Sequence, residues 1–519
     1  MIGALSVAAD MAVGLSAGHG IRAAYVGMQV ADRLKLPHDQ RADLFYAELM
    51  MDAGCTAWAS QIAATVLGDD IAARRHLFFF CDPRDPRDLL KWLARYMAAG
   101  ESLGTRVRHS LDFVVRGRAF MQEGLENTCE VAARLAHRLG RSSGVQEGLR
   151  FIFEQWDGSG PHRRRAATIP IVSRIVFATL LIEVTHQIGG RDAALQLVRA
   201  RRGKALDPDV VDAFVALGED DAFWRGLEQE SIWPMVREME PDSRDRSLRS
   251  DRIDEAACAF ADFADLKSFY SAGHSRRVAA LAEQMAQALA LPSPDVTAVR
   301  RAGLLHDIGL VAVPSFVLHK PEDRLTDAER ESLRLHPYYA ERILSYVPAF
   351  APIIPLVTSH HEQPDGRGYF RGLSGDAIPA GASVLAVADR FDELTHAGPG
   401  RAAVDDGAAI EAIRASAGLV FSREAVEALA HVAPARAGES APETASAREP
   451  KGARPAGLTD REVDVLRLLA TGASRRSIAE RLSVSEHTVR HHLEHIYAKI
   501  DVRTRVEATL FAIEHALIQ

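Results

Sequence analysis

Residues 304–309 read LLHDIG, and residues 49–54 read LMMDAG, 255 positions earlier. Both stretches are short apolar runs that end in Asp, an apolar residue and Gly. The tetrapeptide SAGH occurs at 16–19 and again at 271–274, with the same offset of 255. A fixed offset shared by separate motifs indicates that the chain contains an internal repeat.

A second offset relates a later part of the repeat. The segment FEQWDGSG at 153–160 matches HEQPDGRG at 361–368, 208 positions apart. The change of offset indicates an insertion of 47 residues in the first copy, which we place within residues 77–126. Identities at both ends of the repeat predict that the body of the chain is two copies of one domain.

Helical patterns dominate the whole chain. Runs rich in Ala, Leu, Arg and Glu are punctuated by Gly or Pro, and strand-like alternation is scarce, so we predict an all-α protein. A stretch that mixes Pro, Ala, Gly and both charges without an apolar face predicts a linker. The predicted segments are a first copy at 1–240, a second copy at 250–433, the linker at 434–457 and a C-terminal module at 458–519.

The composition excludes several classes of protein. With 47% hydrophobic and 25% charged residues among 519, the chain is typical of globular rather than disordered proteins. No apolar run was found that approaches the ~20 residues of a membrane span, and Asp10 interrupts an N-terminal stretch that lacks a basic region. The cysteines Cys55, Cys81, Cys129 and Cys258 form no CxxC pair. We therefore expect reduced thiols, a cytoplasmic location and no membrane partner.

The second copy concentrates side chains that bind metals. Imidazole and carboxylate ligands without cysteine suit Fe, Mn or Zn. A set of this size is enough for two divalent ions, and a two-metal site polarises a phosphodiester and activates water. A lone histidine is more often a structural residue, but a cluster with two adjacent pairs favours a metal centre. The candidate ligands are His274, His306, Asp307, His336, His360, His361 and Asp389.

Six motifs in order resemble the HD-GYP family, an all-helical branch of the HD superfamily of metal-dependent phosphohydrolases. They are GHSRRV (273–278), HDIG (306–309), LHKPEDRLT (318–326), HP (336–337), HHEQPDGRGY (360–369) and ADRFDELT (388–395). The resemblance implies that the seven candidates are metal ligands, that Asp307 bridges two metals and acts in catalysis, and that the substrate is cyclic di-GMP or another phosphoester. The substrate-binding residues that it implies are Asp365, Gly366, Gly368, Tyr369 and Arg401.

The second copy departs from the family's pattern near the substrate. Leu310 stands where the family usually has Lys after HDIG, and Phe370 replaces the Pro of GYP. Gly398 occupies one of two cationic positions of a phosphate clamp, of which Arg401 remains, and Tyr270 stands where some members have a third-metal glutamate. Because each lost charge-assisted bond removes about 1.5–3 kcal/mol, rapid hydrolysis of cyclic di-GMP does not follow from metal binding.

The first copy keeps only two of the seven ligands, His19 and Asp52. Two ligands cannot hold a metal pair, so we predict a degenerate pseudo-domain for scaffolding, pairing or sensing rather than a vestigial catalytic domain. The other ligand positions carry Met51, Thr128, Ile152, Phe153 and, opposite Asp389, Thr179. The loop residues that remain, and that predict an unchanged loop shape, are Glu154, Gln155, Asp157, Gly158 and Gly160.

The C-terminal module reads as four helices. Thr459 and Glu462 form a capping box before the first helix, which Gly472 ends, and Ser474 begins the second. Ser485 is a natural N-cap for the third helix. The core face of this third helix is predicted at Val489, Leu493, Ile496 and Ile500.

This module resembles the LuxR-type (GerE-like) helix-turn-helix over nearly its full length, through LTDREVDVLRLLATG, IAERLSVSEHTVRHH and YAKI. The resemblance implies binding to double-stranded DNA and dimerisation through a fourth helix at about 503–517; a helical bundle for protein contact is the alternative. The module carries nine Lys or Arg and nine Asp or Glu, so we expect weak binding by one copy and a homodimer. The predicted DNA-binding residues are Arg475, Arg476, Thr488, Arg490, His491, His495 and Lys499.

Three functions stay open at this point. The second copy could bind metals and a nucleotide and so control a DNA-binding regulator, with slow hydrolysis. It could be an active cyclic di-GMP phosphodiesterase with a DNA-binding output, or a scaffold without catalysis. The complete ligand set counts against the scaffold, while Leu310 and Gly398 favour the first function over the second.

Overall fold

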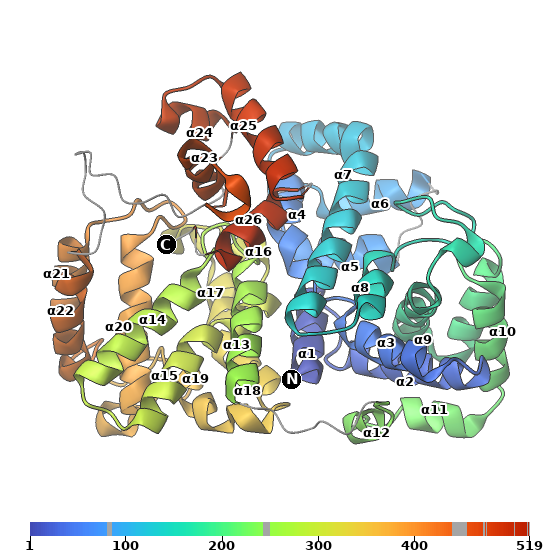
Figure 1. Cartoon of the computed structure of the whole chain (residues 1–519), viewed down its shortest axis with the longest axis horizontal. Helices are drawn as coiled ribbons and strands as arrows, with labels where there is room; N and C mark the ends of the chain where they lie inside the picture. The colour runs from blue at the N-terminus through green and yellow to red at the C-terminus, as the bar shows by residue number, and fades with distance from the viewer. Residues whose placement is uncertain are drawn as a thin grey trace. The chain divides into compact units, whose positions relative to one another are not determined.

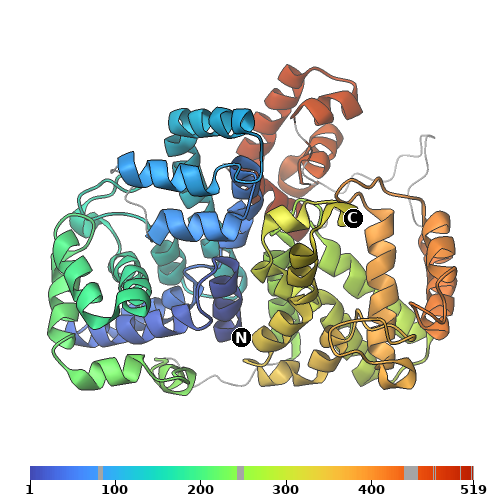
Figure 2. The ribbon, with the colours of Figure 1, turned by 180° about the vertical axis from the view of Figure 1, so that it is seen from behind.

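A computed structural model of the chain consists of helices joined by turns and loops (Figure 1). The structure describes residues 1–79, 86–241, 250–437, 454–470, 473, 475–502, 504–515 and 517. Within these ranges it has no β-strand and only isolated β-bridges, which confirms the predicted all-α class. The opposite view shows the same helical construction (Figure 2).

Contacts along the chain define two compact units. The first comprises Met1–Ala259 with Pro314–Phe316, and the second comprises Phe260–Val313 with Val317–Gln519. The first unit therefore contains the first copy together with residues 250–259 and 314–316 of the second, and the second unit contains the rest of the second copy and the C-terminal module.

In the first copy, α2 packs against both α3 and α9. Its α-helices are α1 (Ile2–Ala12), α2 (His19–Arg33), α3 (His38–Met50), α4 (Ala59–Val66), α5 (Asp70–Phe79), α6 (Pro86–Tyr96), α7 (Leu103–Arg138), α8 (Ser143–Arg150), α9 (Ile171–Arg201), α10 (Pro208–Leu217), α11 (Asp221–Leu227) and α12 (Trp233–Glu238). The 3-10 turns are η1 (Cys55–Trp58) and η2 (Ala166–Thr168).

In the second copy, α14 packs against α15, α20 and α22. The α-helices are α13 (Ser250–Asp265), α14 (His274–Ala288), α15 (Ser293–Leu305), α16 (Ser315–Leu318), α17 (Asp327–Arg334), α18 (His336–Leu344), α19 (Ile354–Thr358), α20 (Ala380–Thr395), α21 (Asp406–Arg414) and α22 (Arg423–Ala437). The 3-10 turns are η3 (Ile308–Ala312), η4 (Glu322–Arg324), η5 (Pro348–Ile353) and η6 (Gly375–Ala377).

The insertion in the first copy forms additional helices. Between η1 and the second half of α7, the first copy has α4, α5 and α6, where the second copy has only the short helices α16 and α17. A separate apolar core around Trp58, Trp92 and Phe113 holds these helices together. The additional helices begin before residue 77. The predicted segment for the insertion, 77–126, therefore starts too late in the sequence.

Over its described residues, the C-terminal module has four α-helices after the turn η7 (Pro455–Gly457), and each contributes apolar residues to one core. Gly472, Ser474 and Arg503, which we expected at helix boundaries, lie outside the described residues. The helices are α23 (Asp460–Ala470), α24 (Arg475–Leu482), α25 (Glu486–Lys499) and α26 (Arg505–Glu514).

Helix α9 contains the most apolar long segment of the described chain. By length and composition alone it could cross a membrane. However, 72% of its most apolar window is buried inside the protein, as expected of a core helix. Gly190, with φ 72°, kinks the helix beyond this apolar part.

Candidate metal centre and DNA-binding module

The seven predicted ligands converge in the second unit, and most of them stand at helix ends. They are His274 at the start of α14, His306 and Asp307 between α15 and η3, His336 at the start of α18, His360 and His361 just after α19, and Asp389 inside α20. All are buried or half-buried. Segments that are distant in the sequence thus contribute to one site.

His274, His306 and Asp389 form a first group of possible ligands. The Nε2 atoms of the two histidines lie 3.3 Å apart. Oδ1 of Asp389 lies 3.2 Å from Nε2 of His274 and 3.6 Å from Nε2 of His306. Three donor atoms that face one another in a buried site suit a single cation.

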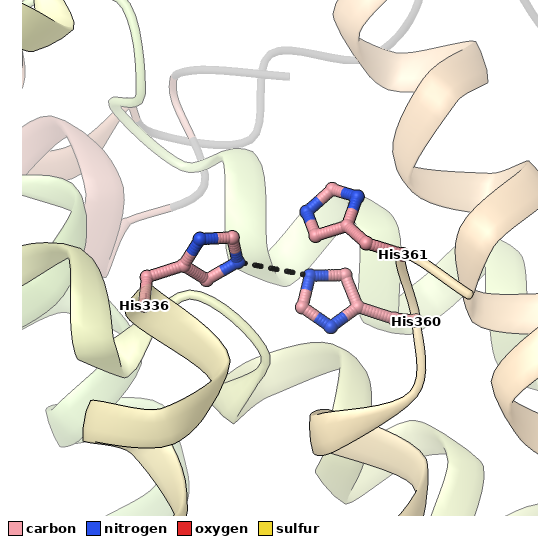
Figure 3. Close-up of side chains that lie close together, drawn as sticks. All are labelled: His336, His360 and His361. Atoms are coloured by element: carbon pink, nitrogen blue, oxygen red, sulfur yellow. Dashed lines mark hydrogen bonds between the residues drawn. The ribbon is translucent and has the colours of Figure 1, made fainter. Parts of the chain in front are cut away.

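His336, His360 and His361 form a second group, in which the three rings turn toward a common point (Figure 3). The Nε2 atoms of His336 and His360 lie 3.3 Å apart. The ring of His361 lies 4.0 Å from that of His360 and 5.0 Å from that of His336, between centroids. This group offers three imidazole ligands.

Asp307 faces both groups, with one carboxylate oxygen toward each. Its Oδ2 lies 3.6 Å from Nε2 of His274 and 3.4 Å from Nε2 of His306. Its Oδ1 lies 3.7 Å from Nε2 of His336 and 4.0 Å from Nε2 of His360. A carboxylate placed in this way can bridge two cations.

The protonation of three histidines follows from their hydrogen bonds. Each Nδ1 faces a backbone carbonyl, which only accepts, so Nδ1 carries a proton, and in the neutral ring Nε2 presents a lone pair. At 3.3 Å the Nε2 lone pairs of His336 and His360 repel each other unless a cation lies between them. Two nitrogens each ~2.0–2.1 Å from one tetrahedral metal would be about 3.3 Å apart. The bonds are His306 to Gly303 at 2.9 Å, His336 to Leu333 at 2.7 Å and His360 to Val357 at 2.6 Å. The residues present therefore fit bound metal ions.

Asp392 orients the remaining histidine of the first group. Its Oδ2 lies 2.7 Å from Nδ1 of His274, and its Oδ1 accepts a hydrogen bond of 2.7 Å from Nε of Arg277. A buried carboxylate behind a ligand histidine fixes the ring and raises the basicity of its metal-facing nitrogen. Sequence reasoning missed this residue, although it stands one helical turn after Asp389.

The pKa values of the histidines shift in opposite directions in the two groups. Burial lowers the pKa of His336, His360 and His361, that of His361 to about 3, so these rings are neutral at pH 7, as metal binding requires. Burial would also lower the pKa of His274, but hydrogen bonds with Asp389 and Asp392 outweigh it and raise this pKa well above its usual value. The first group thus favours positive charge.

The loop after His361 is held by Glu362. Its carboxylate accepts hydrogen bonds from the backbone N–H groups of Arg371 (2.6 Å), Gly372 (3.0 Å) and Leu373 (2.9 Å). A Cβ on Gly368 would lie 2.4 Å from the backbone nitrogen of Gln363, so only glycine fits there.

The predicted substrate-binding residues lie in three places: in the loop, beside the metal centre and at the end of α20. Asp365 accepts the backbone N–H of Arg367 at 2.9 Å, and Gly366 has φ 77°, so with Gly368 they shape the loop. The ring of Tyr369 stacks on His361 with centroids 4.7 Å apart and lies at the metal centre. Arg401 donates to the backbone carbonyls of Glu393 and Leu394 at the end of α20.

Two departures from the family's motifs are also visible. Leu310 packs against a small apolar cluster that includes Val313, Val317 and Leu325. The backbones of Gly398 and Arg401 bond each other in a tight turn, with both N···O distances 3.0 Å. Both positions therefore have local structural roles.

In the first copy an ion-pair network surrounds His19, the counterpart of His274. Nδ1 of His19 bonds Glu183, whose other oxygen accepts Nε of Arg22 at 2.5 Å. Nε2 of His19 lies 3.9 Å from Oδ2 of Asp52. Burial alone would lower the pKa of His19, but the Glu183 carboxylate outweighs it and raises the pKa to about 9. A protonated imidazole thus supplies the positive charge.

The two copies share a close backbone contact of a glycine. A Cβ on Gly54 would lie 1.8 Å from the carbonyl oxygen of Thr128, and one on Gly309 would lie 1.9 Å from that of His336. These contacts support the match of Thr128 with His336. Met51 and Ile152, at two other former ligand positions, are buried.

One predicted match is wrong by one residue. Glu183 bonds the histidine of the first copy as Asp392 bonds that of the second, so the offset in this helix is 209. Asp389 is therefore matched by Leu180, not by Thr179, whose hydroxyl donates to Glu48 instead. The shift arises because the second copy has one extra residue in the preceding loop.

Two framework carboxylates were also missed. Asp10 accepts the backbone N–H groups of Gly18 (2.7 Å) and Gly20 (3.1 Å), and Asp265 accepts the N–H of Ser275 (3.1 Å). Burial raises the pKa of both acids to about 7. The offset of 255 relates them and could have revealed the pair.

The module confirms the predicted helix caps. Glu462 accepts the backbone N–H of Thr459 at 2.7 Å, while Thr459 accepts that of Glu462 at 3.3 Å. Ser485 accepts the N–H of Thr488 at 3.0 Å. The predicted core face of α25 is buried at Val489, Leu493, Ile496 and Ile500.

The predicted DNA-binding residues differ in their surroundings. Arg475, Arg476, Arg490, His491 and His495 are exposed on α24 and α25. Thr488 is half-buried, and its hydroxyl bonds Ser485 at 2.8 Å. In contrast, Nζ of Lys499 lies 2.6 Å from the buried carboxylate of Glu462 and 3.2 Å from the carbonyl of Gly457. Lys499 therefore joins α25 to α23.

This fold and site define the class of HD-domain phosphohydrolases with an appended helix-turn-helix. Residues 259–424 match the HD domain family, and residues 456–512 match the family of bacterial regulatory proteins of the luxR type.

A 3'3'-cGAMP-specific phosphodiesterase (number 3) of Vibrio cholerae is 32% identical over 401 residues, 77% of this chain and 86% of the relative. The chain therefore belongs to the HD-GYP family of phosphodiesterases. A match of this length must extend into the first copy.

Two further comparisons agree with this family. A crystal structure of a cyclic GMP-AMP-specific phosphodiesterase of V. cholerae superimposes with a TM-score of 0.58 at 28% identity, over 83% of this chain and 96% of that one. The cyclic di-GMP phosphodiesterase response regulator RpfG of Xanthomonas campestris is 37% identical over 155 residues, 30% of this chain and 41% of the relative.

Proposed function

We propose that this protein is a metal-dependent phosphodiesterase of 3'3'-linked cyclic dinucleotides, located in the cytoplasm, that also binds double-stranded DNA. The observation that carries the proposal is the placement of Asp307 between two groups of ligands. The relative that matches most of this chain supports 3'3'-cGAMP as the first substrate to test.

Seven side chains would hold two divalent ions, Fe, Mn or Zn. They are His274, His306 and Asp389 for one ion, His336, His360 and His361 for the other, and Asp307 for both. When bound, such ions polarise a phosphodiester and make hydroxide available at neutral pH.

The chain's own groups prepare this chemistry. Backbone carbonyls accept hydrogen bonds from Nδ1 of His306, His336 and His360 and keep these atoms protonated. Nε2 of each ring is then available to bind a metal ion. Asp392 and Arg277 fix the ring of His274. The ring of Tyr369 covers His361 and limits the access of water to that side of the centre.

The test compares the purified wild type with Asp307→Ala. Metal content and turnover of 3'3'-cGAMP and cyclic di-GMP are measured on both proteins. We expect metal in the wild type, hydrolysis of at least one of the two, and loss of turnover by a factor on the order of 100 or more in the variant, because both groups lose a ligand. Glu183→Gln, in the copy without metals, is the control.

Abundant metal without turnover that depends on Asp307 would contradict the proposed phosphodiesterase activity. It would favour the second candidate, a regulator in which metal and nucleotide binding control DNA occupancy. The side chain of Leu310 supports this second candidate, because it is apolar and packed in an apolar cluster where the family's motif has a cation.

A further inference from the structure

A strip of aromatic rings leads away from the metal centre of the second unit. This aromatic strip consists of Tyr369, Phe370 and Tyr338. The ring of Tyr369 stacks on His361 at 4.7 Å, with an interplanar angle of 20°, and lies 6.3 Å from the ring of His336. The ring of Phe370 lies 6.0 Å from that of Tyr338, which is 38% exposed. The strip thus joins metal ligands to the surface.

Guanidinium groups flank the aromatic strip. Arg371 is held in place by two hydrogen bonds to the carboxylate of Glu341, at 2.7 and 2.8 Å. The distances from guanidinium carbon to ring centroid are 5.6 Å for Arg334 and Tyr369, 5.3 Å for Arg371 and Phe370, and 5.8 Å for Arg342 and Tyr338. Tyr338 is exposed and Phe370 is half-buried, and aromatic rings beside guanidinium groups are the surface on which nucleic-acid bases stack.

The first copy serves as an internal control for the loop part of the strip. In both copies the loop glutamate bonds the backbone beyond the matched glycine, through N–H groups of His162 and Arg371. Between these two fixed points the first copy has only Pro161, whereas the second copy has Tyr369 and Phe370. Both rings are therefore absent from the first copy.

The helical part of the strip has also changed. The match of Thr128 with His336 pairs Tyr338 with Glu130, two residues further along the helix. It also pairs Arg334 with Glu126, which reverses the charge. Neither an aromatic ring nor the cation remains at these positions.

The two copies thus share the residues that build the fold and differ in the strip and the metal ligands together. Rings that were needed only for packing would be expected in both copies. The framework residues that both copies keep are Asp10 and Asp265, Gly54 and Gly309, Glu154 and Glu362, and Gly160 and Gly368. This difference links the aromatic strip to a ligand of the metal centre.

We propose that the aromatic strip is the subsite for one purine base of the substrate. The base stacks on Tyr338 and Phe370, beside the Arg371 guanidinium, while the phosphodiester lies at the metal centre next to Tyr369. This inference rests on the proposed function, because it requires a substrate that has both a phosphodiester and a base.

The test uses the full chain with its metals and two substrates. The variants Tyr338→Ala and Phe370→Ala should each raise KM for 3'3'-cGAMP by about tenfold or more, as expected for the loss of one stacking contact. Their turnover of methyl 4-nitrophenyl phosphate, which has no base, and their metal content should stay unchanged. The controls Tyr338→Phe and Phe370→Tyr keep the rings and should keep KM.

The outcomes separate this inference from the proposed function. If the wild type hydrolyses 3'3'-cGAMP and both alanine variants keep its KM, the subsite is wrong and the enzyme stands. If both variants lose turnover of the two substrates equally, or lose metal, the rings are structural and the subsite is also wrong. A metal-loaded wild type that neither binds nor hydrolyses any cyclic dinucleotide would overturn both proposals.

Discussion

At the scale of single residues, Asp392 and Glu183 have equivalent positions in the two copies. Each carboxylate bonds Nδ1 of the histidine that begins a helix and pairs with the arginine three residues later. In the second copy the histidine's Nε2 then faces other candidate ligands, whereas in the first it lies 3.9 Å from Oδ2 of Asp52. The same pair thus orients a ligand in one copy and neutralises a buried charge in the other.

This equivalence gives a matched pair of variants. Asp392→Asn should lower metal affinity by about 10–100-fold, the usual effect of losing the carboxylate behind a ligand histidine. Glu183→Gln should leave metal content unchanged but destabilise the first copy by about 3 kcal/mol, because it breaks a buried ion pair. Metal titration and thermal unfolding measure the two effects. Equal metal loss in both variants would contradict the assignment.

Residue types alone predicted the seven candidate ligands that the structure brings together, but not the groups behind them. The ligands stand in short motifs, so their pattern is visible in the sequence. The carbonyls of Gly303, Leu333 and Val357 are backbone atoms that any residue could supply. The match of Thr179 with Asp389 failed because one extra loop residue shifts the register by about 100° around a helix.

At the scale of elements, the loop after the paired histidines is the most constrained part of the site. The loop glutamate binds three backbone N–H groups in the second copy and two in the first. Gly368 and Gly160 pack against backbone atoms at the same place in each loop. The loop therefore keeps its shape even where the ligands are gone.

Substituting these glycines tests whether the loop positions the metal centre. Gly368→Ala puts a Cβ 2.4 Å from the nitrogen of Gln363, so the backbone beside His361 must move. We expect turnover to fall by on the order of 100-fold, as for a ligand displaced by about 1 Å. Gly160→Ala introduces a similar contact, 2.6 Å from Cα of Glu154, and should reduce stability but leave turnover unchanged. Assays of turnover and unfolding distinguish the two, and an active Gly368→Ala would contradict this role.

Element boundaries were predictable where a local signal marks them. Capping by Thr459 and Ser485 fixed the starts of two helices in the module. The helices of the insertion were not foreseen, because their core is formed by contacts among Trp58, Trp92 and Phe113 rather than by a repeat. Helix α9 shows that length and apolar composition alone do not separate a buried core helix from a membrane span.

At the scale of the whole molecule, a neutral DNA-binding module is attached to a chain of net charge −8. Electrostatic attraction to DNA must therefore come from a few exposed cations on α24 and α25. Lys499 is engaged with Glu462, so we leave it out of the proposed DNA contacts. The phosphate contacts that we propose are Arg475, Arg476 and Arg490.

The salt dependence of DNA binding reports how many modules bind at once. Each neutralised phosphate contributes about 0.9 to the slope of log Kobs against log salt concentration. If two chains bind one site, Arg475→Ala removes two phosphate contacts and should lower the slope by about 2; if one chain binds, it should lower the slope by about 1. Arg414→Ala, the same loss of charge at an exposed position of α21 in the second copy, should leave the slope unchanged. Fluorescence anisotropy on a labelled duplex at several salt concentrations measures both variants. A decrease near 1 would contradict the homodimer, and an unchanged slope for Arg475→Ala would remove this residue from the DNA interface.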